Sequence, residues 1–308
     1  MPGVAMLRGR RCPPLPARFV LIAPGPFPLT LTVSFAVLLA ALLHASWNAM
    51  LKGGRDVLLD TALIVIGAGV VMLPFVFVLP LPARASWPYL AASLATHVAY
   101  YTFMVNAYRT GDLSLVYPLM RGAAPLVAAL LGVVWLNELP APLAWAGMAA
   151  ISGGVVLLAW RTADHTPSRR AVGFALANAL VIALYTVIDG AGVRLAGNAW
   201  SYIVWLFVID AVPFTLFVLW QRGGHALFGY VREFPGRMLG GGGASAGAYA
   251  ISVWAMTQAP VALVASLRET SVLFATLFGA HVLRERLTGL RWAGVGAVVA
   301  GVLALKAV

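Results

Sequence analysis

Apolar residues follow one another along this chain in long continuous blocks separated by short polar breaks. Ten blocks of roughly 20 residues, the length of helix that crosses a hydrocarbon core of about 30 Å, occupy 30–51, 61–81, 87–108, 113–136, 141–160, 171–193, 200–220, 238–257, 260–283 and 288–306. A transmembrane β-barrel would instead show alternating segments of about 10 residues. The pattern therefore predicts an all-α integral membrane protein with about ten transmembrane helices.

Composition supports this prediction and narrows the class of protein. Hydrophobic residues make up 61% of the chain and charged residues only 10%, against about 25% charged residues in soluble domains. Most breaks between the blocks are short, so we expect a compact bundle without a soluble domain. The net charge of +11 fits lysines and arginines at membrane surfaces, and nothing in the sequence indicates a nucleic-acid partner.

The ends of the blocks divide the chain into four segments. Residues 1–28 are basic and proline-rich, and we interpret them as a disordered tail because their one apolar stretch, FVLIA, is too short for a signal-peptide core. We assign a first five-helix repeat to 29–160, a linker to 161–170 and a second repeat to 171–308. The one cysteine, Cys12, excludes an internal disulfide framework and any cysteine-based metal site, and we expect neither a metal nor a cofactor.

The second half of the chain repeats the first at an offset of 147 residues. At this offset Arg268 falls under Arg121 and Glu285 under Glu138, and the pairs Trp145/Trp292, Gly132/Gly279, Gly147/Gly294 and Gly154/Gly301 also coincide. Because a unit of five helices is odd, the second copy enters the bilayer in the opposite sense. Such inverted repeats are typical of secondary transporters whose substrate binds near the membrane midplane.

These paired blocks resemble the EamA-type family of the drug/metabolite transporter superfamily, and HASWNAMLK at 44–52 is similar to a first-helix pattern of some members. The resemblance covers about 30–306 and implies ten-helix carriers made of two five-helix repeats. Some relatives with the first-helix pattern are associated with phosphonates, but the family as a whole carries many unlike metabolites.

Two arginines lie near the middle of apolar blocks, where a charge costs about 2.5–3.5 kcal/mol on insertion scales. We predict that Arg121 and Arg268 face a central cavity and hold an anionic group, since guanidinium forks match carboxylate and phosphate oxygens. The alternative is that each arginine ties helices together through carbonyls or one buried acid. Glu269 adjoins Arg268 but would point about 100° away from it on a helix.

Three acids, Glu269, Asp210 and Asp189, lie within or near the blocks. A carboxylate inside a membrane is costly unless it is neutral or paired, so each could carry a coupling proton. The alternative is a permanent salt bridge to Arg121 or Arg268, which we favour for Asp210 and leave open for Glu269.

Polar side chains also recur at helical spacing, which places them on one face of each helix. The stripes comprise His44, Asn48 and Lys52; His97, Tyr101 and Tyr108; Asn178, Tyr185 and Asp189; and Ser245, Tyr249 and Ser252. We predict that His44, Trp47, Asn48, Tyr101, Tyr185 and Tyr249 line the substrate site with the arginines. The alternative is hydrogen bonding between helices.

Three further expectations concern helix geometry. Pro118 and Pro125 bracket Arg121 and are expected to kink or break that helix. Gly243 and Gly247 are expected to let another helix approach closely. Glu138 and Glu285 are each expected to cap the N-terminus of the helix that follows them in the chain.

The leading hypothesis is a gradient-driven transporter of a small anionic or zwitterionic metabolite such as an amino acid, which works by alternating access between the two repeats. The runner-up is an intramembrane enzyme acting on a lipid-linked substrate, although the chain lacks a G-x-S-x-G elbow and a His-Glu-x-x-His motif. A channel or scaffold is a third class. We expect the chain to act as a monomer or homodimer whose partners are the bilayer, a substrate and a coupling proton.

We expect the protein to reside in the cytoplasmic (inner) membrane, but two signals disagree about its orientation. If the N-terminus were cytoplasmic, seven lysines and arginines would lie inside and twelve outside, which is the reverse of the positive-inside rule. The family resemblance implies a cytoplasmic N-terminus. The direction of transport stays open with the orientation.

Overall fold

The computed structural model describes residues 29–52, 54–111, 113–159, 168–282 and 288–308. The first half contains α1 (Leu31–Lys52), α2 (Val57–Met72), the 3₁₀ turns η1 (Leu73–Phe77) and η2 (Arg84–Ser86), α3 (Trp87–Thr110), α4 (Leu113–Leu131), the π-turn η3 (Gly132–Leu136) and α5 (Pro142–Ala159). The second half contains α6 (Arg169–Leu195), α7 (Ala199–Glu233), α8 (Pro235–Ala255), α9 (Val261–Arg268), α10 (Ser271–Val282) and α11 (Gly289–Lys306).

Every predicted block contains a helix, and the described residues form no strand, which confirms the all-α membrane fold. Seven spans are long and apolar enough to cross a membrane by length and composition: those of α1, α2 with η1, α4 with η3, α6, α7, α9 with α10, and α11. The polar α3, the glycine-rich α8 and the shorter α5 are not among these seven. The predicted tail 1–28 and most of the linker lie outside the described residues.

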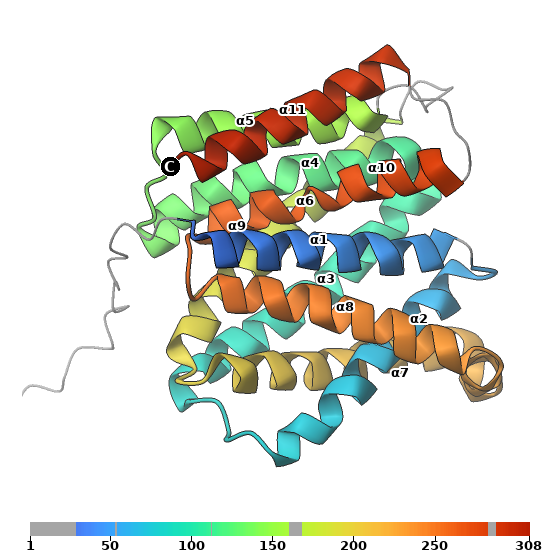
Figure 1. Cartoon of the computed structure of the whole chain (residues 1–308). Helices are drawn as coiled ribbons and strands as arrows, with labels where there is room; N and C mark the ends of the chain where they lie inside the picture. The colour runs from blue at the N-terminus through green and yellow to red at the C-terminus, as the bar shows by residue number, and fades with distance from the viewer. Residues whose placement is uncertain (1–28, 53, 112, 160–167, 283–287) are drawn as a thin grey trace, which may run out of the picture.

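Helices α5 and α11 occupy equivalent positions in the two repeats, and they pack against each other along their length (Figure 1). A Cβ added to Gly147 would lie 2.9 Å from the Gly301 carbonyl oxygen, and one added to Gly294 would lie 3.0 Å from that of Gly154. Residue numbers therefore rise along one helix in the direction in which they fall along the other. These two equivalent helices run antiparallel, as an inverted repeat requires.

A second close approach joins α2 to α8, but not through the glycines predicted from the sequence. A Cβ added to Gly67 or to Gly242 would collide with the backbone of the other helix, whereas one added to Gly243 would meet nothing within 4 Å. Gly247 would meet only a leucine side chain of α1, at 3.3 Å. The expectation for Gly243 is wrong because the helix turns Gly242, one residue earlier, toward α2.

Two other departures from regular helices differ from expectation. Helix α4 contains both Pro118 and Pro125 without a break, whereas its second-repeat counterpart is divided between α9 and α10 although it has no proline. Residues 199–233, labelled α7, form two helices that meet at a kink at Gly223, whose φ of 77° lies in the region that glycine tolerates best. The expected loop after residue 220 is thus reduced to this kink.

The bundle interior is formed where helices of both repeats converge (Figure 1). Helix α4 packs on α5, α6 and α9; α3 packs on α6 and α7; and α1 lies against α8, α9 and α10. The polar faces of α3, α4, α6, α8 and α9 meet in this interior and position the residues described next.

Candidate functional site

The two arginines of the repeat are both buried, but they have different surroundings. Nε of Arg121, on α4, lies 2.9 Å from Oε2 of Glu269, which follows α9 in the other repeat. The N–H does not aim at this oxygen, so the contact is an ion pair rather than an aligned hydrogen bond, and Nη2 of Arg121 has no hydrogen-bond acceptor in the described part of the chain. Glu269 is only 1% exposed, so the pair joins the two repeats inside the bundle.

The break between α9 and α10 explains why Glu269 can face the opposite repeat. At the break the amides of Glu269 and Thr270 bond to the carbonyls of Ser266 and Leu267, three residues back. These tighter turns keep the backbone paired without continuing the α-helix. The Glu269 side chain therefore leaves the α9 direction and reaches Arg121.

Arg268 lacks a carboxylate at ion-pair distance among the described residues. It is 3% exposed, and its guanidinium carbon lies 5.5 Å from the centre of the Tyr249 ring, a cation–π geometry. Its Nε has no hydrogen-bond acceptor in the described residues. Arg268 is also the last residue of α9, and the negative end of the helix dipole favours a cation there.

The first-helix residues are only partly placed with the arginines. His44 lies within electrostatic range of both Arg121 and Arg268, and its ring packs edge-on against Trp47 at 5.0 Å between centres. The buried indole nitrogen of Trp47 has no acceptor among the described residues. Asn48, by contrast, donates its amide to the carbonyl of His44 on its own helix, so this amide hydrogen bond is local.

Tyr101 and Asp210 lie together in a neighbouring cluster with His97. Oδ1 of Asp210 lies 3.6 Å from Nδ1 of His97, and Oδ2 accepts a long hydrogen bond of 3.4 Å from the Tyr101 hydroxyl. The predicted salt bridge from Asp210 to an arginine is wrong. Asp210 sits on α7, which packs against α3, and α3 presents His97 and Tyr101 instead.

Asp189 and two predicted tyrosines connect this cluster to Arg268. The Asp189 carboxylate accepts hydrogen bonds from Tyr202 at 2.9 Å and from Tyr249 at 2.5 Å. Tyr185 stacks on His97 with ring centres 4.5 Å apart and meets Tyr249 edge-on. The Tyr249 ring thus contacts Arg268 while its hydroxyl contacts Asp189.

Comparisons with known proteins agree with this architecture. Residues 169–306 match the model of the EamA-like transporter family. The second half of the chain is an EamA domain. This match confirms the family resemblance drawn from the sequence and indicates a multi-pass membrane transporter. No curated protein matches the chain.

A solved structure described only as "Crystal structure of protein" has the same fold. It is 18% identical to this chain, with a TM-score of 0.68, and the alignment covers 89% of this chain and 94% of that one. At this identity the likeness concerns the fold alone.

Glu138 of the first repeat contacts the C-terminal end of α6 and the N-terminal end of α9, both in the second repeat. Its Oε2 accepts a 2.8 Å hydrogen bond from the Val261 amide at the start of α9, and its Oε1 lies 2.7 Å from Nη2 of Arg194. Arg194 also donates to the carbonyls of Met256 and Ala259. Glu138 therefore caps a helix as predicted, but the helix is α9 of the other repeat rather than α5. Glu285 lies outside the described residues.

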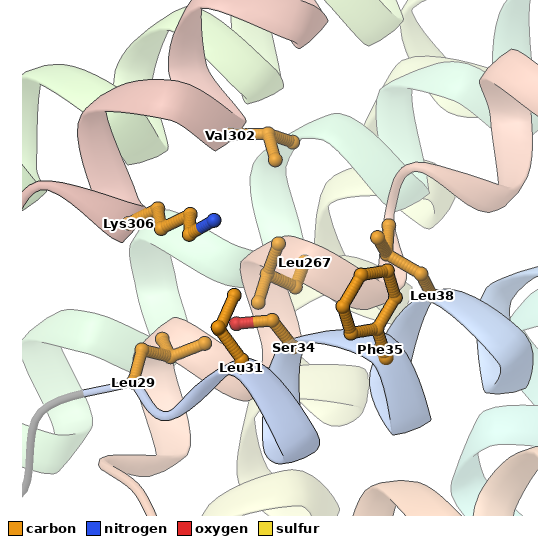
Figure 2. Close-up of a pocket in the computed structure, with 8 residues that line it drawn as sticks. All are labelled: Leu29, Leu31, Ser34, Phe35, Leu38, Leu267, Val302 and Lys306. Carbon is orange, nitrogen blue, oxygen red and sulfur yellow. The ribbon is translucent and has the colours of Figure 1, made fainter.

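An apolar cleft of about 100 Å³ lies apart from these charged groups, between α1, α9 and α11. Figure 2 shows Leu31, Phe35, Leu267 and Val302 on its walls, with Lys306 as its charged residue. Because none of the residues of the arginine or histidine clusters lines it, we place the candidate substrate site elsewhere, at the arginines.

Sequence analysis did not identify several members of the site. Tyr117 lies one turn before Arg121 on α4, within electrostatic range of the two arginines. Helical spacing from Arg121 could have pointed to Tyr117. The role of Ser93 beside His97 could likewise have been found from its spacing of four residues. Nothing local marks Arg194 as the partner of Glu138.

Proposed function

We propose that the protein is a gradient-driven transporter of a small zwitterionic or anionic metabolite such as an amino acid, bound between Arg121, Arg268 and Glu269. The observation that carries the proposal is this buried group of two guanidiniums and one carboxylate, contributed by both repeats. A charged residue inside a membrane protein is expected to be functional because its burial is costly.

The arrangement suits a molecule that carries both a carboxylate and an amine. Arg268 Nε and Arg121 Nη2 have no protein acceptor in the described residues, so a substrate carboxylate would supply what they lack. An ammonium group would find Glu269 beside Arg121. Tyr249, Tyr185, Tyr100 and Trp47 provide aromatic surface for the rest of the molecule.

Alternating access would use the ties between the repeats at opposite ends of α8. Arg194 holds the C-terminal carbonyl of this helix at Met256 and pairs with Glu138 of the first repeat. Near the N-terminus of α8, Arg237 Nη1 lies 2.7 Å from Oδ1 of Asp60 on α2. The 21 residues of α8 separate the two ties by about 30 Å, and each would have to open to admit substrate from its side.

The test is a transport screen in proteoliposomes of the full chain. Wild type should show saturable uptake of at least one amino acid or small carboxylate in counterflow. Arg268→Ala should abolish it, whereas the control Arg84→Ala, at an exposed position, should not. Flux that never saturates would indicate a channel. Saturable uptake that survives in Arg268→Ala would remove this arginine from the site.

A further inference from the structure

A histidine flanked by two carboxylates lies in the bundle interior next to the arginine site, and substrate binding as proposed above does not use it. We propose that His97, held between Asp210 and Asp189, is a proton-binding site that couples proton movement to substrate binding through Tyr249 and Arg268. The coupling rests on the proposed transport function, whereas the proton site itself is independent of it.

The ring nitrogen Nδ1 of His97 has two oxygens close to it. Ser93 Oγ lies at 3.4 Å and Asp210 Oδ1 at 3.6 Å. That carboxylate oxygen is buried and has no hydrogen-bond donor in the described residues. A proton on Nδ1 would provide the missing donor, and a movement of a few tenths of an ångström would bring the pair to hydrogen-bonding distance.

Groups from four helices face this histidine. Its neighbours are Ser93 on α3, Tyr185 on α6, Asp210 on α7 and Tyr249 on α8. Asp189 on α6 lies within electrostatic range of the ring, and Tyr101 on α3 bonds to Asp210. The Ser93 hydroxyl also faces Asp189, and a hydroxyl can donate on one side and accept on the other. His97 can therefore exchange a proton with Asp210 directly and with Asp189 through Ser93.

Counting charges shows why a proton belongs in this interior. Arg121 and Arg268 contribute two positive charges, and Glu269, Asp189 and Asp210 contribute three negative ones, so these five groups sum to −1. One proton on His97 brings the sum to zero. Burying unbalanced charge is costly in a low-dielectric interior, and histidine is the side chain that ordinarily changes charge between pH 5 and 8.

Tyr249 provides the physical link between the proton site and Arg268. Its hydroxyl donates to Asp189 and its ring lies beneath the Arg268 guanidinium. A substrate carboxylate that binds Arg268 neutralises the positive charge of this guanidinium, which would otherwise balance the negative charge of Asp189. The cluster then holds its proton more tightly, and by linkage the proton strengthens carboxylate binding to the same extent. Proton and substrate should thus cross the membrane in the same direction.

The proton site can be tested without a substrate. The full-length protein, labelled with ¹³C in its histidine rings and placed in lipid nanodiscs, would be titrated by NMR from pH 5 to pH 9. The His97 signal, assigned by its loss in His97→Gln, should change between its neutral and charged positions. Asp210→Asn, which removes a neighbouring negative charge, should move the midpoint of this change, and Arg84→Ala should leave it unchanged. A His97 signal fixed in one form throughout, or an unmoved midpoint in Asp210→Asn, would overturn the site.

Coupling is tested in proteoliposomes with whichever compound the counterflow screen identifies. His97→Gln should retain exchange of that compound at equal pH but lose the accumulation that a pH gradient of one unit drives. For one coupled proton this accumulation is at most tenfold, because one unit corresponds to a tenfold ratio of proton concentration. Asp210→Asn provides a second variant should His97→Gln fold poorly. Undiminished accumulation in both would overturn the coupling. If no compound is transported but His97 titrates as expected, the transport proposal fails while the proton site stands.

Discussion

The helix that carries Arg121 and its counterpart in the second repeat stabilise a buried arginine in different ways. Helix α4 is continuous, so Arg121 lies in mid-helix and requires a carboxylate from elsewhere, which Glu269 supplies. Helix α9 ends at Arg268, so this cation gains a helix C-terminus and the face of Tyr249. Equivalent arginines in an inverted repeat can therefore be stabilised by unequal surroundings.

The residues that follow the two arginines account for much of this difference. Gly122 follows Arg121, and a Cβ there would lie 3.1 Å from the Ser152 carbonyl oxygen and 3.0 Å from a Val156 methyl on α5. The equivalent position in the second repeat is Glu269, which follows the end of α9 and carries the carboxylate that pairs with Arg121. One copy thus uses the position for helix packing and the other for charge.

The largest expected effect is a loss of stability when Arg121 is replaced, and it should exceed the loss when Arg268 is replaced. Arg121→Ala leaves Glu269 buried without its ion-pair partner and should lower the free energy of unfolding by about 3–5 kcal/mol. Arg268→Ala leaves no ion-paired acid behind and should cost only about 1–2 kcal/mol, the scale of a desolvated cation–π contact. Denaturation in detergent, followed by tryptophan fluorescence, would measure both.

The matched control for this comparison is the double variant Arg121→Ala with Glu269→Gln. It should recover at least half of the stability lost in Arg121→Ala, because the stranded charge is gone. Equal losses for the two single arginine variants would show that the unequal surroundings have no energetic consequence.

The glycine contacts between α5 and α11 should respond symmetrically, unlike the arginines. Gly154→Leu and Gly301→Leu each force a side chain into the backbone of the other helix, and each should destabilise the protein by roughly 2–3 kcal/mol. Gly296→Leu is the control, since a Cβ there meets nothing within 4 Å. Thermal unfolding of the three variants would measure the effect. Losses that differ by more than about 1 kcal/mol between the two contact variants, a difference easily resolved on the scale of overpacking costs, would argue against an equivalent role.

A smaller effect is expected at Gly122. Gly122→Ala adds one methyl group against α5 and should cost about 1 kcal/mol, at the lower end of overpacking costs. Gly153→Ala on the neighbouring helix, where a Cβ meets nothing within 4 Å, should be neutral or slightly stabilising. The melting temperatures of the two variants, measured in the same detergent, test this predicted difference. A fully stable Gly122→Ala would show that α4 and α5 can separate without cost.

The sequence determines the repeat but not its asymmetry. Long apolar blocks predict helices because only a paired backbone is stable in lipid, and the offset of 147 residues predicts Arg121 and Arg268 as equivalents. The break at Glu269 has no proline or glycine to announce it, and α4 keeps its two prolines without breaking. Which acid faces which cation depends on packing between helices far apart in the chain, so Asp210 was paired with the wrong partner and Arg194 was not identified.

The last prediction concerns the Tyr249 side chain, and it divides the support of Arg268 into a contribution of the hydroxyl and one of the ring. Tyr249→Phe keeps a ring beneath the guanidinium but removes the hydrogen bond to Asp189, and should cost about 1–2 kcal/mol because the acceptor is charged. Tyr249→Leu also removes the ring and should cost about 1 kcal/mol more, the scale of a cation–π contact. Chemical denaturation of both variants would measure the costs. Arg268→Ala tests whether this extra cost comes from the cation–π contact. In that background the extra cost of leucine over phenylalanine should shrink toward zero, since the ring then has no cation above it. If the extra cost persists unchanged, the ring acts through general packing, and Arg268 is stabilised by the end of α9 alone.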